Sequence, residues 1–195
     1  MESVAITGAV RQELGKKSSK AVRRNQHVPC VIYGGEKVLH FSAHKNDFKT
    51  LIYTPDFKIA KISVDDGNFD CIVKDIQFHP LTDEIEHIDF VQLVPEKKIK
   101  LEIPVRFKGQ APGVKEGGKM VQKMRRVKVK TTLESLVDSL YVDVSGMGLG
   151  QSVRVRDIEV SGDMEIMSSM GTPVASIEIP RALRSAEAAK AAEEN

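Results

Sequence analysis

The chain has 195 residues, of which 41% are apolar and 29% are charged, and its formal net charge is +2. This length allows one large domain or two small ones, and the apolar content is sufficient for a core. No apolar run approaches the roughly 20 residues that a transmembrane helix needs, so we expect no membrane span. The N-terminus lacks the pattern of a secretory signal, and we therefore expect a cytoplasmic protein.

Basic and acidic side chains alternate in blocks along the chain. Residues 1–30 carry 6 basic and 2 acidic side chains, and residues 96–130 carry 12 and 3. The intervening residues 31–95 carry 6 basic and 11 acidic side chains, and residues 131–195 carry 5 and 11. Two basic blocks separated by acidic ones indicate defined anion-binding surfaces and not a uniformly cationic chain.

The first half of the chain, residues 1–94, predicts a small β domain. Its apolar patterns indicate six strands, over residues 4–10, 29–33, 38–42, 59–64, 69–78 and 85–93. We expect two short helices. One ends near Arg24, with Ser18 or Ser19 as its N-cap and with Ala21 and Val22 facing inward, and the other covers residues 44–53. Six short strands with helices at the openings indicate a closed or nearly closed barrel, which leaves no exposed sheet edge.

Residues 95–180 predict a second domain that is all-β or mostly β, so the fold class of the whole chain is mainly β. Apolar residues alternate without interruption over residues 99–107, and further strands are expected over 121–132, 140–144, 152–155 and 173–179. Residues 109–118 form a glycine-rich segment that we expect to be a flexible hairpin loop. The Ala/Glu-rich residues 181–195 contain almost no large apolar side chain, which predicts a flexible tail.

Several patterns resemble enzyme, cofactor or metal sites, but none has the residues that such a site needs. The segment at residues 113–119 nearly matches GxxxxGK[ST], but Met120 stands where the motif needs a hydroxyl, and no helix is predicted to follow. Cys30 and Cys71 lie in apolar runs without metal-site spacing, so buried, reduced thiols are expected rather than a disulfide or a metal site. We therefore expect no enzyme, no cofactor, no metal and no small-molecule substrate.

The basic segment from Arg11 to Arg24 is the clearest functional signal that the residues carry by themselves. It holds six Lys and Arg side chains and a single acidic residue, Glu13. Basic side chains neutralise phosphates and release counterions, and Ser19 can donate a hydrogen bond to a phosphate. The alternative is a solvated helix face, which ordinarily carries acidic partners at i,i+4 spacing. The pattern favours a nucleic-acid backbone as the partner.

A second polar group consists of Gln77, His79, His87 and Asp89. His87 and Asp89 are two residues apart, so on a strand they face the same side. A metal site would need three or four converging ligands. The other interpretations are a structural turn with a satisfied histidine, and a polar face that presents donors and acceptors to base edges and 2′-hydroxyls in the wide, shallow minor groove of RNA.

Two long motifs in this order resemble a known family. RQELGKKSSKAVRRNQHVPCVIYGG, at residues 11–35, and FHPLTDEIEHIDF, at residues 78–90, closely resemble the bacterial large-subunit ribosomal protein twenty-five family, whose members bind 5S ribosomal RNA. Residues 103–119, 140–146 and 150–158 resemble the C-terminal β domain of the family's long form, the general stress protein of the CTC type. The resemblance covers essentially residues 2–180.

This resemblance implies a non-enzymatic protein of the large ribosomal subunit in the cytoplasm, with an N-terminal six-stranded barrel of the kind found in the anticodon-binding domains of glutaminyl-tRNA synthetase. It implies binding to the loop-E region of 5S rRNA through a widened minor groove. The implied RNA contacts are Arg11, Lys16, Ser19, Lys20, Arg23 and Tyr33, with Gln77, His87 and Asp89 reading the groove. Lys20 and Lys74 depart from the residues that are common in the family, which reduces Lys20 to a point-charge contact.

Two alternatives stay open at this point. One is a stress-induced RNA-binding factor that acts off the ribosome. The other concerns the basic stripe at residues 123–130 in the second domain. This stripe is expected either to contact ribosomal RNA or to be an exposed strand face protected by its charge. The second domain as a whole is expected to contact 23S rRNA and neighbouring ribosomal proteins.

Overall fold

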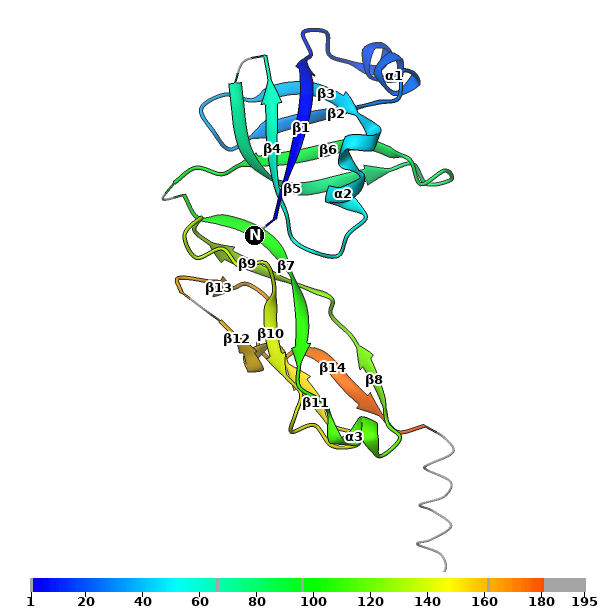
Figure 1. The fold of residues 1–195 in the computed structure, drawn as a ribbon, viewed down its shortest axis with the longest axis vertical. Helices are drawn as coiled ribbons and strands as arrows, with labels where there is room; N and C mark the ends of the chain where they lie inside the picture. Colours follow the sequence, from blue (N-terminus) through cyan, green and yellow to red (C-terminus); the bar gives the residue numbers. More distant parts are fainter. Residues whose placement is uncertain (1, 66, 96, 161, 181–195) are drawn as a thin grey trace, which may run out of the picture. The chain divides into compact units, whose positions relative to one another are not determined.

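The computed structural model describes residues 2–65, 67–95, 97–160 and 162–180 (Figure 1). They form two compact units, the described residues up to Ile99 with Thr132–Asp138, and Lys100–Thr131 with the described residues from Ser139 onward. The tail expected at residues 181–195 lies outside the described residues. Within the described ranges, no helix is long and apolar enough to cross a membrane.

The first unit contains a closed barrel with the strand order β1-β3-β2-β6-β5-β4. The strands β1 and β4, and likewise β2 and β6, pair in parallel, whereas the other neighbours pair antiparallel. The six-stranded barrel that the sequence predicts is therefore confirmed. Its strands are β1 (Ser3–Val10), β2 (His27–Tyr33), β3 (Leu39–His44), β4 (Ile59–Val64), β5 (Gly67–Phe78) and β6 (Ile85–Gln92).

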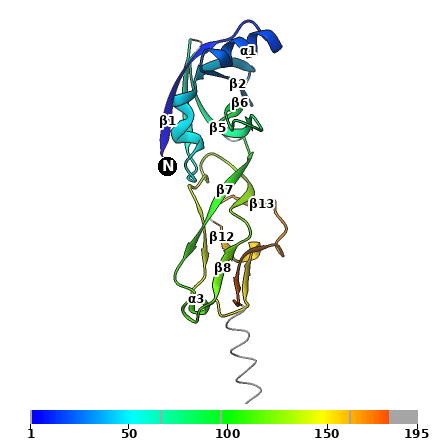
Figure 2. The ribbon, with the colours of Figure 1, turned by 90° about the vertical axis from the view of Figure 1, so that its right-hand side faces the viewer.

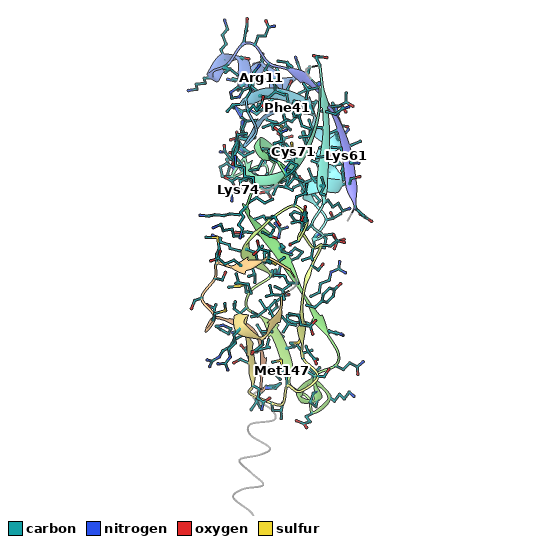
Figure 3. All side chains as sticks on the ribbon, turned by 90° about the vertical axis from the view of Figure 1, so that its left-hand side faces the viewer. Arg11, Phe41, Lys61, Cys71, Lys74 and Met147 are labelled. Carbon is teal, nitrogen blue, oxygen red and sulfur yellow. The ribbon has the colours of Figure 1, made fainter. Side chains whose placement is uncertain are left out.

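Alternate residues of these strands fill the barrel with apolar side chains. The ring of Phe90 lies 5.9 Å from that of Phe41 and 6.2 Å from that of Phe48, measured between centroids. Cys30 and Cys71 are buried and unpaired, as expected, and burial raises the pKa of both thiols, that of Cys71 to about 12. Figure 3 shows Phe41 and Cys71 inside the barrel and Lys61 and Lys74 at its outer surface. The outward positions of the same strands are thus available for polar side chains.

The helix in the basic segment, α1 (Lys16–Arg24), begins before the serines that the sequence suggested as its N-cap. Gly15, with φ 112° and ψ 176°, is the N-cap residue, and no side chain caps the helix. Ser18 and Ser19 instead lie within the helix, so the expected serine cap is wrong. Ala21 is exposed and Val22 only half-buried, so the expected inward face is only partly present. The helix lies outside the barrel wall, next to β2 (Figures 1 and 2).

The second helical segment forms in two parts. A 3-10 helix, η1 (Lys45–Phe48), continues directly into α2 (Lys49–Ile52). The imidazole of His44 caps the segment, because its Nδ1 accepts a hydrogen bond from the backbone N–H of Asn46 at 3.3 Å. Phe48 and Leu51 are buried, which matches the amphipathic pattern over residues 44–53.

The second unit is mostly β, as expected, and consists of two sheets. One has the order β12-β10-β7-β9-β13 and the other the order β11-β14-β8. The strands are β7 (Ile99–Lys108), β8 (Lys119–Gln122), β9 (Arg126–Thr131), β10 (Leu140–Asp143), β11 (Ser152–Arg154), β12 (Ile158–Glu159), β13 (Glu165–Ile166) and β14 (Pro173–Glu178), with a 3-10 helix η2 (Val155–Asp157) between β11 and β12.

Two details of this unit differ from the sequence prediction. The strand expected over residues 121–132 is divided into β8 and β9, because the backbone amides of Lys123 and Met124 both bind the carbonyl of Val174. The glycine-rich segment contains a helical turn, α3 (Pro112–Lys115), and packs on another glycine-rich segment. The Gly113 amide donates to the Met147 carbonyl at 3.0 Å, so this segment is a packed connection and not a flexible loop.

Candidate RNA interface

Helix α1 presents an unusually uncompensated positive charge. Its nine residues include five basic side chains and no acidic one. None of these five side chains forms an ion pair with an acidic residue in the part of the chain that the structure describes. Lys16 and Lys20 are exposed, in agreement with a role in phosphate binding. Because these cations have no acidic partners, several of them can bind the same anionic ligand.

Arg11 fixes the loop that leads from β1 into α1. Its guanidinium donates from Nη2 to Ser19 Oγ at 3.1 Å and to Ser18 Oγ at 3.4 Å. Ser18 Oγ in turn donates to the carbonyl of Glu13 at 2.9 Å. Arg11 and Ser19, both expected RNA contacts, therefore bind each other, and both remain partly exposed. Their first role in the structure is to hold the basic loop against the helix.

Arg23 connects the helix with the polar strand. It is half-buried, and its Nη1 donates to the backbone carbonyl of Glu86 at 3.2 Å. Glu86 immediately precedes His87 on β6. The two expected halves of the site, which are more than 60 residues apart in sequence, are thus joined by a direct hydrogen bond.

The polar residues of β5 and β6 lie on the outer face of the barrel. His87 Nδ1 lies 2.7 Å from Asp89 Oδ1, and the two side chains are 29% and 30% exposed, so the shared face that their spacing predicts is confirmed. Gln77, which is exposed, stands directly opposite His87 in the antiparallel pairing of β5 and β6. These three side chains therefore form one group on two neighbouring strands.

Two more residues complete this face, Tyr33 and Asp75. Asp75 is not among the site residues that the sequence predicts. Asp75 stands directly opposite Asp89 in the β5–β6 pairing. Partial burial, and then the negative charges of Asp89 and Asp75, raise the pKa of Tyr33, so the phenol lies within the field of both carboxylates. We call Tyr33, Asp75, Gln77, His87 and Asp89 the polar face.

His79 belongs to a turn and not to the polar face. Its Nδ1 accepts backbone hydrogen bonds from Leu81 at 3.4 Å and Thr82 at 3.3 Å. The interpretation as a structural turn with a satisfied histidine therefore applies to His79. Within the described ranges, no group of three or more His, Cys, Asp or Glu residues is arranged to hold a metal ion. Lys74 is exposed at a β-bulge between Val73 and Asp75 (Figure 3).

The basic stripe of the second unit differs from α1 because its lysines have acidic partners. Lys123 Nζ lies 3.0 Å from Glu178 Oε1. Lys128 lies 3.8 Å from Glu102, and Lys130 lies 3.9 Å from Glu165 on the neighbouring strand. These pairs neutralise much of the stripe, which favours an exposed strand face protected by charge over a phosphate-binding surface.

Comparison with known proteins places both units in known families. Residues 6–90 match the family model of the ribosomal L25p family, and residues 98–181 match that of the C-terminal domain of ribosomal protein TL5. The chain is 40% identical over 191 residues to the large ribosomal subunit protein bL25 of Cytophaga hutchinsonii, with 98% of this chain and 99% of the relative covered. The protein of the same name from Phocaeicola vulgatus is 38% identical over 195 residues, with 96% and 98% covered.

The two family models match in this order along the chain, and the relatives are covered almost completely. These matches define the class of protein as a ribosomal protein of two domains. The chain is a member of the ribosomal L25p family, in the long form that also carries a domain of the TL5 C-terminal type. This is a family of ribosomal proteins and not of enzymes.

Proposed function

We propose that this protein is a structural constituent of the large ribosomal subunit that binds the loop-E region of 5S rRNA through α1 and the polar face. The relatives are named as proteins of the large ribosomal subunit, which favours this role over a factor that acts off the ribosome. The protein would accordingly reside on cytoplasmic ribosomes. The RNA-binding domain is assigned to residues 1–94 and the second domain to residues 95–180.

The observation that carries the proposal is the hydrogen bond from Arg23 to the carbonyl of Glu86. It links a helix of five basic side chains to the strand on which His87 and Asp89 lie. Phosphate contacts give affinity with little sequence information, whereas base-edge contacts give specificity. A surface that holds both kinds of group together is suited to a structured RNA groove.

The two parts of the surface would have different tasks. Lys16 and Lys20 bind phosphates directly, because both are exposed and have no described acidic partner. The internal hydrogen bonds of Arg11, Ser19 and Arg23 hold the loop and the helix in place. The donors of these side chains that remain free would bind the RNA backbone. A guanidinium has five N–H donors, so one internal hydrogen bond leaves others for phosphate oxygens.

On the polar face, Gln77, His87, Asp89 and Tyr33 would read the groove. Gln77 offers both a donor and an acceptor, and the Asp89 carboxylate accepts hydrogen bonds from amino groups and hydroxyls. The contact between His87 and Asp89 fixes the orientation of the carboxylate before RNA arrives. Such mixed polar groups suit a wide, shallow RNA minor groove with exposed 2′-hydroxyls. Tyr33 adds a phenol that can stack on a base or bond to a sugar.

A gel-shift experiment with the full chain tests this function. The protein is titrated against 5S rRNA and against a 5S rRNA whose loop E is replaced by an ordinary Watson–Crick helix. We expect stoichiometric binding to the first RNA and much weaker binding to the second. Arg23→Ala should weaken binding, whereas Arg154→Ala, in the second unit, should not. Equal affinity for the two RNAs would contradict the proposal.

The second domain is proposed to contact 23S rRNA or neighbouring ribosomal proteins within the subunit. Because three lysines of the stripe at residues 123–130 are paired with acidic side chains, neighbouring proteins fit this surface better than an RNA backbone. Crosslinking of the lysines on intact large subunits would identify the partner. Crosslinks confined to RNA would contradict the preference for a protein.

A further inference from the structure

The polar face contains a pair of like charges that packing alone does not explain. Asp75 and Asp89 are directly opposed residues of neighbouring antiparallel strands. Like charges in this arrangement destabilise a sheet. Asp89 has His87 at 2.7 Å, whereas Asp75 forms no ion pair with a cationic residue of the described part of the chain. The barrel therefore keeps a carboxylate at Asp75 at some cost to its own stability.

The orientation of Asp75 leaves it open to solvent. One of its oxygens, Oδ1, accepts a hydrogen bond from the backbone N–H of the next residue, Ile76, at 3.0 Å. The side chain is exposed, and the β-bulge at Lys74 directs it to the outer face beside Asp89.

The charge of the surface changes sign across three neighbouring strands. Next to β2 lies α1, whose five cations have no described acidic partner. At β5, on the other side of β6, lies Asp75. A phosphate is attracted at the first position and repelled at the second, so the surface favours an RNA in one orientation.

We propose that Asp75 is a specificity-determining residue, which repels RNA backbone from the β5 side of the polar face and so admits only an RNA that presents base-edge donors there. This inference rests on the proposed function. In the minor groove the amino group of guanine is the donor that a base pair offers, and 2′-hydroxyls donate as well. Selection by a repulsive group is a general means of rejecting wrong partners.

The experiment compares Asp75→Asn with Asp70→Asn, a matched control. Asp70 is an exposed aspartate of the same strand. Its opposite residue is Lys61 on β4, and the β5–β6 pairing begins only at Cys71, so no acidic residue of β6 stands opposite it. Dissociation constants are measured for 5S rRNA and for the 5S rRNA with the replaced loop E, at one fixed salt concentration. Asp75→Ser is measured in parallel, and thermal unfolding of every variant is recorded.

We expect Asp75→Asn to bind the altered RNA more tightly by about fivefold, which corresponds to the removal of one unit charge about 4 Å from a phosphate in water. Its affinity for normal 5S rRNA should rise by less, so the ratio of the two affinities falls. Asp70→Asn should leave the ratio unchanged. Relief of the like-charge pair should also leave Asp75→Asn at least as stable as the wild type.

The inference is overturned if Asp75→Asn and Asp75→Ser keep the wild-type ratio, or if both lose affinity for normal 5S rRNA alone. The second result would make Asp75 an attractive contact. A wild type that binds the two RNAs equally would overturn the proposed function, and this inference with it. The wild-type ratio thus tests the function, and the change in the ratio tests Asp75.

Discussion

Raising the salt concentration should steeply weaken the proposed binding to 5S rRNA, because this binding would depend on cations that have no acidic partner within the described part of the chain. The expected phosphate contacts include four basic side chains, Arg11, Lys16, Lys20 and Arg23. Each phosphate that is neutralised releases counterions from the RNA, and this release is less favourable at high salt.

The number of contacts sets the magnitude. Each contact contributes about −0.7 to −0.9 to the slope of log affinity against log salt, so four contacts give a slope of roughly −2.8 to −3.6. Between about 50 mM and about 200 mM salt, the affinity should therefore fall by roughly 50-fold to 150-fold. A surface without these contacts would show almost no dependence.

Fluorescence anisotropy with labelled 5S rRNA at several salt concentrations measures this slope. Lys20→Gln should make the slope less steep by about 1, because one phosphate contact is lost. Lys123→Gln is the control, since Lys123 Nζ already lies 3.0 Å from Glu178 Oε1. The reasoning is refuted if Lys20→Gln keeps the wild-type slope, or if Lys123→Gln reduces it by the same amount.

Two further predictions concern stability and thiol chemistry. Gly113→Ala should destabilise the second unit by about 1–3 kcal/mol in chemical denaturation, because its Cβ would lie 2.6 Å from the carbonyl carbon of Gly148. Gly146→Ala, with open space around its Cβ, should be nearly neutral, and equal losses would refute this account. Burial raises the pKa of Cys30 and Cys71, so neither thiol should react with a thiol reagent at about pH 8 until the chain is unfolded. The same shift should lower the free energy of unfolding as the pH rises above the ordinary thiol value of 9.0, since only the unfolded chain then loses these protons. Rapid labelling of the folded protein would contradict this prediction.

The sequence predicted those elements whose side-chain pattern is long and regular. The strand β7 alternates over its whole length, and its inward residues Leu101, Ile103 and Val105 are buried. Strands such as β12 and β13 have two residues each, which is too short for any periodicity to be seen. The start of α1 was misplaced because Ser18 and Ser19 are engaged by Arg11 and are not free to cap the helix.

The polar face, too, could be predicted only where the alternation of side chains along a strand is regular. His87 and Asp89 could be assigned to one side because no irregularity lies between them. Asp75 was missed because the β-bulge at Lys74 changes the alternation of β5, so that Val73 packs against the core while Asp75 faces outward. The hydrogen bond between Arg23 and Glu86 spans 63 residues and depends on the closed barrel, so no local pattern could indicate it.

The central claim is that α1 and the polar face bind one groove of 5S rRNA, and cleavage by tethered probes tests it most directly. The native Cys30 and Cys71 are buried, so a cysteine placed at Lys20 or Gln77 can be selectively labelled with an iron–EDTA probe. Lys128, on the second unit, is the control position. We predict that the Lys20→Cys and Gln77→Cys probes both cleave within loop E, at neighbouring nucleotides, and that the Lys128→Cys probe does not. Cleavage by the first two probes in separate regions of 5S rRNA would contradict the claim.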